Sequence, residues 1–199
     1  LAHRFLWDLH YASFEEAPQY PISAIYKNTE PSKNAPWVAP GIYTAKLTVN
    51  GKTISQSFAV KMDPRVKTSQ ADLQKIFSAS MTCYEGRKTA KSIQAEIAIA
   101  RKQLKEKIEK AGPDLEQSKA LDQELASLEG ERRGRRAAAS GSVSVGSVES
   151  GFAGLANILH ETEMPATTQT LASVHQTNIQ LGELKNKWAT LKTRLTNLK

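Results

Sequence analysis

The chain has 199 residues, of which 40% are hydrophobic, 24% are charged and 7% are aromatic, and its formal net charge is +7. This length suits one ordinary domain or two small ones, and no apolar run approaches the roughly 20 residues of a membrane-spanning helix. The single cysteine, Cys83, excludes an internal disulfide and a thiolate metal cluster. Disulfide scaffolds and zinc fingers are therefore excluded, and packing must stabilise the fold.

The first third of the chain has the composition of short strands joined by turns, since six of the eight prolines lie at or before position 64. Residues 41–49 alternate apolar and polar side chains, which is typical of a half-buried strand. Asn50-Gly51 suits a type I′ turn, and residues 53–60 return with Ile54, Phe58 and Val60 as candidate core positions. The pattern predicts a β-hairpin.

Phe5, Trp7 and Leu9 form another alternating run and predict a further strand. Three strands would make a small sheet with one face uncovered. Either the helical region covers that face, or further strands precede the chain in a longer protein. The second explanation is favoured.

The composition changes near residue 67, after which long helices are predicted. From Ser69, a good N-cap, to Ala111 there is no proline, and a repeat of about 3.5 residues predicts a helix on the order of 60 Å long. The repeat comprises Leu73, Ile76, Ser80, Cys83, Arg87, Ala90, Ile93, Ile97, Leu104 and Ile108. Such a rod requires another helix along it.

Three further helices are predicted beyond this rod. Gly112-Pro113 ends the long helix and opens a second one, which stops at Gly130. Residues 131–151 have the composition of a flexible loop, a short helix through Phe152 follows, and the last helix begins at Thr167 or Thr168. The economical fold is an antiparallel bundle of three rods whose middle rod is interrupted by the loop.

Several segments resemble the C-terminal region of large secreted bacterial proteins with sortilin-like or BNR-type β-propeller repeats, which are often labelled glycosyl hydrolases. The resembling segments are His3–Leu9, Trp37–Lys52, Val60–Val66 and Met164–Thr168, together with Trp188. The resemblance implies an α+β fold, with a partial Ig-like β-sandwich in residues 1–67 and the helical bundle in residues 68–199. In that family two or more strands precede the Phe-x-Trp-Asp segment, so the β-module is expected to lack its first strands here.

No catalytic, cofactor or metal site is predicted. The four histidines, His3, His10, His160 and His175, lack the spacing that places two ligands on one helical face. Glu15-Glu16 lies in a proline-flanked loop without an opposing carboxylate of the kind that glycosidases need. Cys83 lies on the seam of the long helix and is interpreted as a small buried hydrophobe. Any glycosyl-hydrolase activity would belong to the parent protein.

The positive charge is local. Residues 68–130 carry ten basic and ten acidic residues, whereas four arginines cluster in the 131–151 loop. Arg132, Arg133, Arg135 and Arg136 are candidate contacts for an anionic partner. A solvated basic loop is the favoured interpretation, because the loop lacks the stacking aromatics and the reading helix of nucleic-acid modules.

Two functional hypotheses lead. The first is a non-catalytic accessory region of a secreted or envelope protein, which contacts the propeller of the same parent, another protein or a second copy through its helices. The second is a carbohydrate-binding module in which Trp37, Tyr20 and Tyr26 stack on sugar rings. A nucleic-acid-binding helical adaptor is a weaker third hypothesis. The extracytoplasmic location is implied by the resemblance alone.

Overall fold

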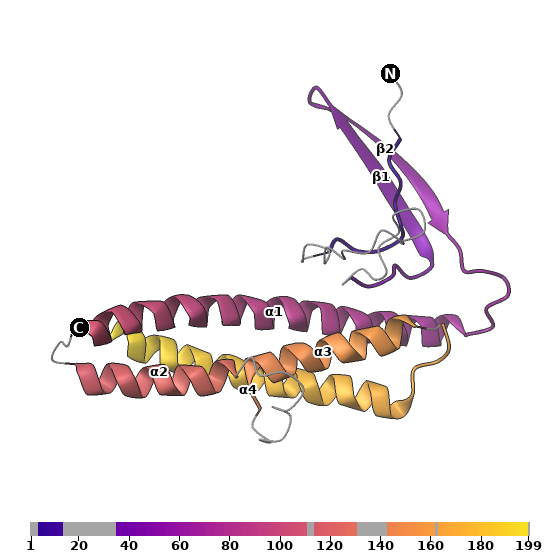
Figure 1. Ribbon diagram of the computed structural model, residues 1–199. Coiled ribbons are helices and arrows are strands. Elements are labelled where there is room, and N and C mark those ends of the chain that lie inside the picture. Colours follow the sequence, from indigo (N-terminus) through magenta and orange to yellow (C-terminus); the bar gives the residue numbers. More distant parts are fainter. Residues whose placement is uncertain (1–3, 14–34, 111–113, 131–142, 162, 199) are drawn as a thin grey trace, which may run out of the picture.

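The computed structural model describes residues 4–13, 35–110, 114–130, 143–161 and 163–198. Within them, a two-stranded antiparallel sheet precedes four helices (Figure 1). The elements are β1 (Gly41–Val49), β2 (Lys52–Val60), α1 (Gln70–Glu109), α2 (Leu115–Glu129), α3 (Val145–His160) and α4 (Thr168–Thr196). The predicted α+β class is confirmed. These residues form one sheet only, so an Ig-like sandwich stays a prediction.

The predicted hairpin is confirmed with its turn. Asn50 and Gly51 both have positive φ angles, 50° and 77°, as a type I′ turn requires. The register pairs Tyr43 with Phe58 and Leu47 with Ile54. Since directly opposed residues of an antiparallel pair share a face, these four side chains lie on the same side of the sheet.

The strand predicted from Phe5, Trp7 and Leu9 is wrong. Residues 4–9 form no ladder, although Figure 1 shows this indigo segment running beside the hairpin. The φ angle of Leu9 is 64°, a left-handed value that breaks an extended run. The chain pairs only beyond this point, where His10 forms an isolated bridge with Trp37.

Helix α1 begins where the sequence predicts. The Ser69 hydroxyl accepts a hydrogen bond from the amide of Asp72, and the helix continues for 40 residues. Its buried positions include most residues of the predicted repeat, among them the polar residues Ser80 and Arg87. The carboxylate of Glu149 on α3 accepts hydrogen bonds from the Arg87 guanidinium at 2.9 Å, which accounts for the buried charge.

The remaining helices complete three rods, as predicted. Figure 1 shows α2 and α3 lying one after the other along α1, with α4 running alongside. Helices α1 and α4 run in the same direction: the Thr68 hydroxyl donates to the Glu163 carbonyl at one end, and Lys107 donates to the Leu198 carbonyl at the other. The middle rod therefore runs antiparallel to both of its neighbours.

The loop predicted for residues 131–151 ends too late. Helix α3 begins at Val145, because Ser144 and Ser147 form a reciprocal capping box. Val145 and Val148 are fully buried, so the glycine, serine and valine stretch is helical over this part. Residues 131–142 lie outside the described residues.

The core runs along the contact of the three rods. Its most buried large side chains come from all four helices. They are Ile97 of α1, Leu125 of α2, Phe152 of α3 and Leu184 of α4. Arg101 of α1 additionally binds Asp122 and Glu129 of α2 at 2.9 and 2.7 Å, which fixes α2 along the rod.

Candidate functional site

The hairpin has one apolar face and one polar face. The apolar face carries Tyr43, Ala45, Leu47 and Val49 of β1 opposite Phe58, Gln56, Ile54 and Lys52 of β2. The opposite face carries mainly threonine, serine and lysine, including Thr48 and Thr53, whose hydroxyls lie 2.9 Å apart. This division is typical of a sheet that packs on a core on one side and meets solvent on the other.

Trp7 covers the base of the apolar face. Its ring packs edge-on against Tyr43 and Phe58, with centroid distances of 5.5 and 6.0 Å. The indole N–H donates to the carbonyl of His10 at 2.9 Å and the Tyr43 hydroxyl donates to the carbonyl of Ala39 at 2.6 Å. Burial of the Tyr43 ring raises the pKa of its hydroxyl, with a smaller contribution from Tyr11. The aromatic cluster thus has its polar atoms satisfied.

Beyond Trp7 the apolar face is bare. Ile54, Leu47 and Val49 are 70%, 62% and 55% exposed, and we call these three residues the bare face. Figure 1 shows that the hairpin tip points away from the helices, so the bundle does not cover this part of the sheet. Adjacent exposed aliphatic side chains on a regular sheet face indicate an interaction surface.

The base of the hairpin meets the helices through the N-terminal segment. The ring of Tyr11 packs on Phe77 of α1 at 5.8 Å, and the Tyr84 hydroxyl donates to the carbonyl of Ala12 at 2.7 Å. Residues 9–11 pair with residues 36–38, where the Val38 amide donates to Leu9 and the Tyr11 amide donates to Pro36. This junction ties the sheet to the first half of α1.

A cavity of about 230 Å³ lies at this junction, and we call it the junction cavity. Its walls come from Trp37 and Pro40 before β1, from Val60 at the end of β2 and Met62 after it, from Ile76 and Phe77 of α1, and from Leu159 of α3. Most of these side chains are apolar. The cavity therefore has the character of a small-molecule site rather than of a hydrated cleft.

Two residues that line this cavity each have a buried side-chain atom without a hydrogen-bond partner. The atoms are Oγ of Ser80, whose residue is 3% exposed, and Nε2 of His160. Among the described residues they are the buried side-chain nitrogen and oxygen atoms left unpaired. Burial lowers the pKa of His160, and the nearby His10 lowers it further, so the imidazole is neutral at pH 7.

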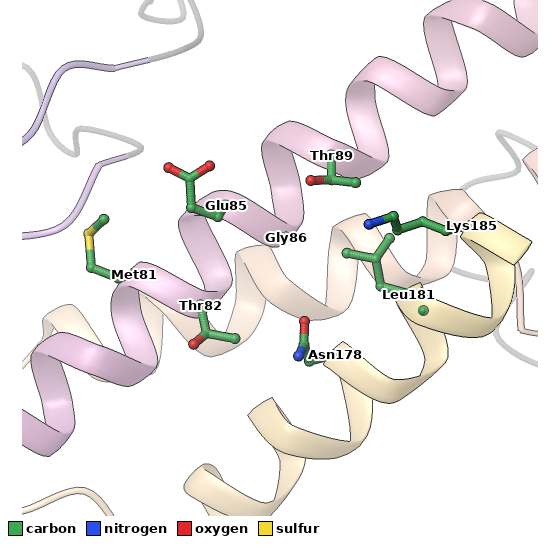
Figure 2. Close-up of a pocket in the computed structure, with 9 residues that line it drawn as sticks. Met81, Thr82, Glu85, Gly86, Thr89, Asn178, Leu181 and Lys185 are labelled. Atoms are coloured by element: carbon green, nitrogen blue, oxygen red, sulfur yellow. The ribbon is translucent and has the colours of Figure 1, made fainter.

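A second hollow is an open groove between α1 and α4. Figure 2 shows Asn178, Leu181 and Lys185 of α4 across from Thr82 and Thr89 of α1, with Gly86 on its floor. The groove measures about 550 Å³, and the Thr82 hydroxyl donates within its own helix to the carbonyl of Ser78. It is broader than the junction cavity, and the described residues that line it include no buried unpaired polar atom.

Of the residues predicted to contact a ligand, Trp37 is placed by the structure. It is 49% exposed, and one side of its ring stacks on His10 with centroids 3.7 Å apart. Tyr20 and Tyr26 lie outside the described residues, as do Arg132, Arg133, Arg135 and Arg136. The glycan and anion contacts therefore stay predictions.

Sequence reasoning missed the junction cavity. The helical repeat places Ser80 on the α1 seam, and the spacing of His160 bears only on a metal site, which it argues against. The two residues come from different helices, and only the packing of α3 on α1 brings them to one wall. The feature of the sequence that could have indicated the cavity is a polar residue, Ser80, at a core position of the helical repeat.

The cysteine has the predicted character. Cys83 is fully buried in the core, and burial raises the pKa of its thiol to about 12 against a smaller opposite effect of Arg87. Within the described ranges, no three histidine, cysteine, aspartate or glutamate side chains are grouped to hold a metal ion. No helix in that part of the chain is long and apolar enough to cross a bilayer.

Comparisons of the chain with known protein families, with curated proteins and with solved structures found no match.

Proposed function

We propose that the chain is a non-catalytic interaction module whose hairpin docks, through the bare face, against further β-structure of its parent protein. The observation that carries this proposal is the exposure of Leu47, Val49 and Ile54 on the face whose base is already packed under Trp7. A two-stranded hairpin is at best marginally stable alone, so additional strands would stabilise it.

The chemistry of the surface favours a β-structured occupant. The bare face is flat and aliphatic, and Lys52 lies opposite Val49 at its rim. An aliphatic face of this kind suits packing against the inner face of a second sheet. The ladder pairs β1 and β2 with one another, and each strand has a second edge that could accept another strand. The resemblance to propeller-associated Ig-like modules supports the same assignment, with the missing strands and the propeller supplied by the parent.

The helical bundle then serves as a spacer of fixed length. Helix α1 has 40 residues, which corresponds to about 60 Å at 1.5 Å per residue. Ion pairs join α1 to every other helix, among them Arg87 with Glu149, Arg101 with Asp122, and Lys192 with Glu96. Such a rod would hold a partner bound at the hairpin apart from a partner bound at the far end of the bundle.

A matched pair of variants tests the docking. The ¹⁵N-labelled chain is titrated with the parent polypeptide that precedes it, and amide shifts are followed by NMR. Shift changes centred on the bare face are expected, and Ile54→Lys should weaken binding by about tenfold or more, because a lysine there would have to be desolvated. Thr53→Lys, one residue away on the polar face, should bind as the unchanged chain does.

Three results would contradict the proposal: shift changes confined to the helices, equal effects of the two variants, or a parent polypeptide that does not bind. Self-association of the chain through the bare face, detected by analytical ultracentrifugation, would instead identify a second copy as the occupant. Hydrolysis of a glycan by this chain alone would overturn the non-catalytic assignment.

Carbohydrate binding is the second candidate, favoured by the half-exposed ring of Trp37. His10 lies against the Trp37 ring at an interplanar angle of 38°, and the exposed half of the ring is the surface proposed to stack on a sugar. A glycan array probed with the fluorescently labelled chain, with the labelled Trp37→Ala variant as the control, tests it. Binding that survives Trp37→Ala, or no binding to any glycan, would remove this candidate.

A further inference from the structure

We propose that the further β-structure joins the hairpin as an added strand, which hydrogen-bonds along the outer edge of β2 and carries apolar side chains at every second position. This assignment rests on the proposed docking function, and it adds the edge that is used and the pattern of the segment that binds. The added strand would widen the apolar face to which Leu47 and Ile54 belong.

The geometry of the turn determines which backbone groups of β2 face outwards. A two-residue type I′ turn joins two residues that exchange both of their backbone hydrogen bonds, here Val49 and Lys52. Because this pattern alternates along an antiparallel ladder, every second residue after Lys52 binds β1, and the residues between them point their N–H and C=O groups away from it. These outward residues, all with exposed side chains, are Thr53, Ser55, Ser57 and Ala59.

One of the outward carbonyl groups is bound by a neighbouring side chain. The Ser57 carbonyl accepts a hydrogen bond from the side-chain amide of Gln56 at 3.1 Å, in an exposed position. Among the described residues, the sheet ends at β2, since β1 is the one strand paired with it. An N–H of an added strand would replace the exposed Gln56 contact. The edge thus offers a row of backbone donors and acceptors, which is the template for β-strand addition.

The two outer edges of the hairpin differ in charge. Lys46 and Ser55 oppose one another in the register, and the backbone groups of each point out of its own edge. A lysine on an edge strand is a common protection against strand addition, and β1 carries one at this position. The outward residues of β2 are uncharged and small, so a neighbouring strand can approach this edge. The added strand therefore pairs with β2 and not with β1.

The side chains along β2 determine the pattern of the incoming segment. Its residues beside Ile54 and Phe58 would lie on the apolar face and be aliphatic or aromatic, since such cross-strand pairs are favourable. Its residues beside Ser55 and Ser57 would lie on the polar face and be threonine or serine. The expected partner is thus an extended segment of alternating apolar and polar residues.

The charge of the hairpin favours a segment that is neutral or acidic. Residues 35–62 contain lysines but no aspartate or glutamate, and Lys52 and Lys61 stand at the two ends of the β2 edge. An acidic residue at either end of the segment would pair with a lysine, whereas a basic one would be repelled. A bound segment with lysine or arginine at both ends would contradict this part of the proposal.

Amide hydrogen exchange identifies the edge that is used. The ¹⁵N-labelled 199-residue chain is saturated with the parent polypeptide that precedes it, and exchange is followed by NMR. The amides of Ser55 and Ser57 should exchange at least about tenfold more slowly than in the free chain, because they gain hydrogen bonds. The amides of Thr44 and Lys46, which point out of the β1 edge, should keep their fast exchange. Slowing at the β1 edge alone, or at neither edge, would overturn the proposal.

Thr44 and Ser57 provide a matched pair of variants. They oppose one another with their hydroxyl oxygens 3.5 Å apart, and the N–H of each points out of its own edge. Ser57→Pro removes a donor to the added strand and spares the β1–β2 ladder, so it should weaken binding of the parent polypeptide by about tenfold or more. Thr44→Pro should bind as the unchanged chain does. Nuclear Overhauser contacts between the rings of Tyr43 and Phe58 verify the hairpin in both variants.

The outcomes separate strand addition from the docking on which it rests. Loss of binding in Ile54→Lys, together with equal binding of Ser57→Pro and Thr44→Pro, would mean that the parent packs on the bare face alone. Strand addition would then be wrong, although docking would stand. A parent polypeptide that does not bind the unchanged chain would overturn both.

Discussion

A Cβ atom placed on Gly86 would lie 2.4 Å from Cε2 of Phe152, so α1 and α3 touch where only a hydrogen atom fits. Phe152 is fully buried, so its ring is enclosed by other parts of the chain. The contact holds the middle rod against α1 close to the Arg87–Glu149 ion pair.

This contact predicts opposite effects of alanine at two helical glycines. Gly86→Ala should lower the free energy of unfolding by up to about 2 kcal/mol, because overpacking costs about 1–3 kcal/mol and the gain in helix propensity is about 1 kcal/mol. Gly182→Ala on α4, where a Cβ meets no atom within 4 Å, should raise it by about 0.5–1 kcal/mol. Urea unfolding followed by circular dichroism measures both changes. A stabilising Gly86→Ala would show that the helices are not in contact there.

Removing the buried ion pair should be costly. The side chains of Arg87 and Glu149 are only 10% and 16% exposed, so Glu149→Gln removes a carboxylate from beside a largely buried guanidinium. We expect a loss of about 3 kcal/mol in the free energy of unfolding. Glu116→Gln breaks the exposed pair with Lys119 and should cost less than about 0.5 kcal/mol. Similar losses in the two variants would mean that the Arg87 pair is solvated.

Two of the buried serines, Ser80 and Ser144, should respond differently to alanine. Ser144 accepts a hydrogen bond from the Ser147 amide at the start of α3, and its loss should cost about 1 kcal/mol. Ser80→Ala removes an unpaired hydroxyl and should be neutral or stabilising by up to about 1 kcal/mol in the free chain. Chemical denaturation of both variants makes the comparison. A clear loss of stability in Ser80→Ala would show that this hydroxyl has a partner in the folded chain.

The neutral, buried His160 should make stability depend on pH. Because burial lowers its pKa in the folded chain, the unfolded chain binds a proton more readily between the folded pKa and the ordinary value of about 6.5. The free energy of unfolding should therefore fall as the pH falls from about 6.5 towards the folded pKa. The partners of Glu96 and Glu124 lower the pKa of those carboxyl groups, whose contributions are lost only in more acidic solution.

Substitution of His160 distinguishes its contribution to the pH dependence of stability from those of the other ionisable residues near the junction cavity, which are His10, Lys61 and Glu163. His160→Gln should flatten the fall in stability between pH 7 and the mildly acidic range, whereas the exposed His175→Gln should leave it unchanged. Thermal unfolding across this range measures the difference. An identical slope in wild type and His160→Gln would contradict a buried neutral imidazole.

Features encoded by neighbouring residues were predictable from the sequence. The Asn50-Gly51 turn, the Ser69 cap and the α1 seam follow from local backbone preferences and from one helical period. The three-rod arrangement followed because a helix as long as α1 has to bury its seam on something of similar length. The hairpin could be predicted because its turn and the alternation along its strands are patterns of neighbouring residues.

Features that depend on residues far apart in the sequence were not predictable. Trp7 lies on the aromatic cluster of the hairpin rather than in a strand, because its position depends on Tyr43 and Phe58 and on the left-handed Leu9. Ser80 of α1 and His160 of α3 both line the junction cavity, and no local pattern encodes the packing of α3 that places them there. The composition of residues 143–151 concealed a helix whose start depends on one reciprocal cap at Ser144.

Hydrogen exchange of the hairpin amides tests the proposed docking most directly. Mass spectrometry compares exchange in residues 41–60 of the isolated chain with exchange in the longer protein proposed as its parent. The docking account predicts rapid exchange in the isolated chain and at least about tenfold slower exchange in the parent, because a two-stranded sheet opens readily until further strands cover it. Equal exchange of the hairpin in both proteins, with the α1 amides protected in each, would contradict docking through the bare face.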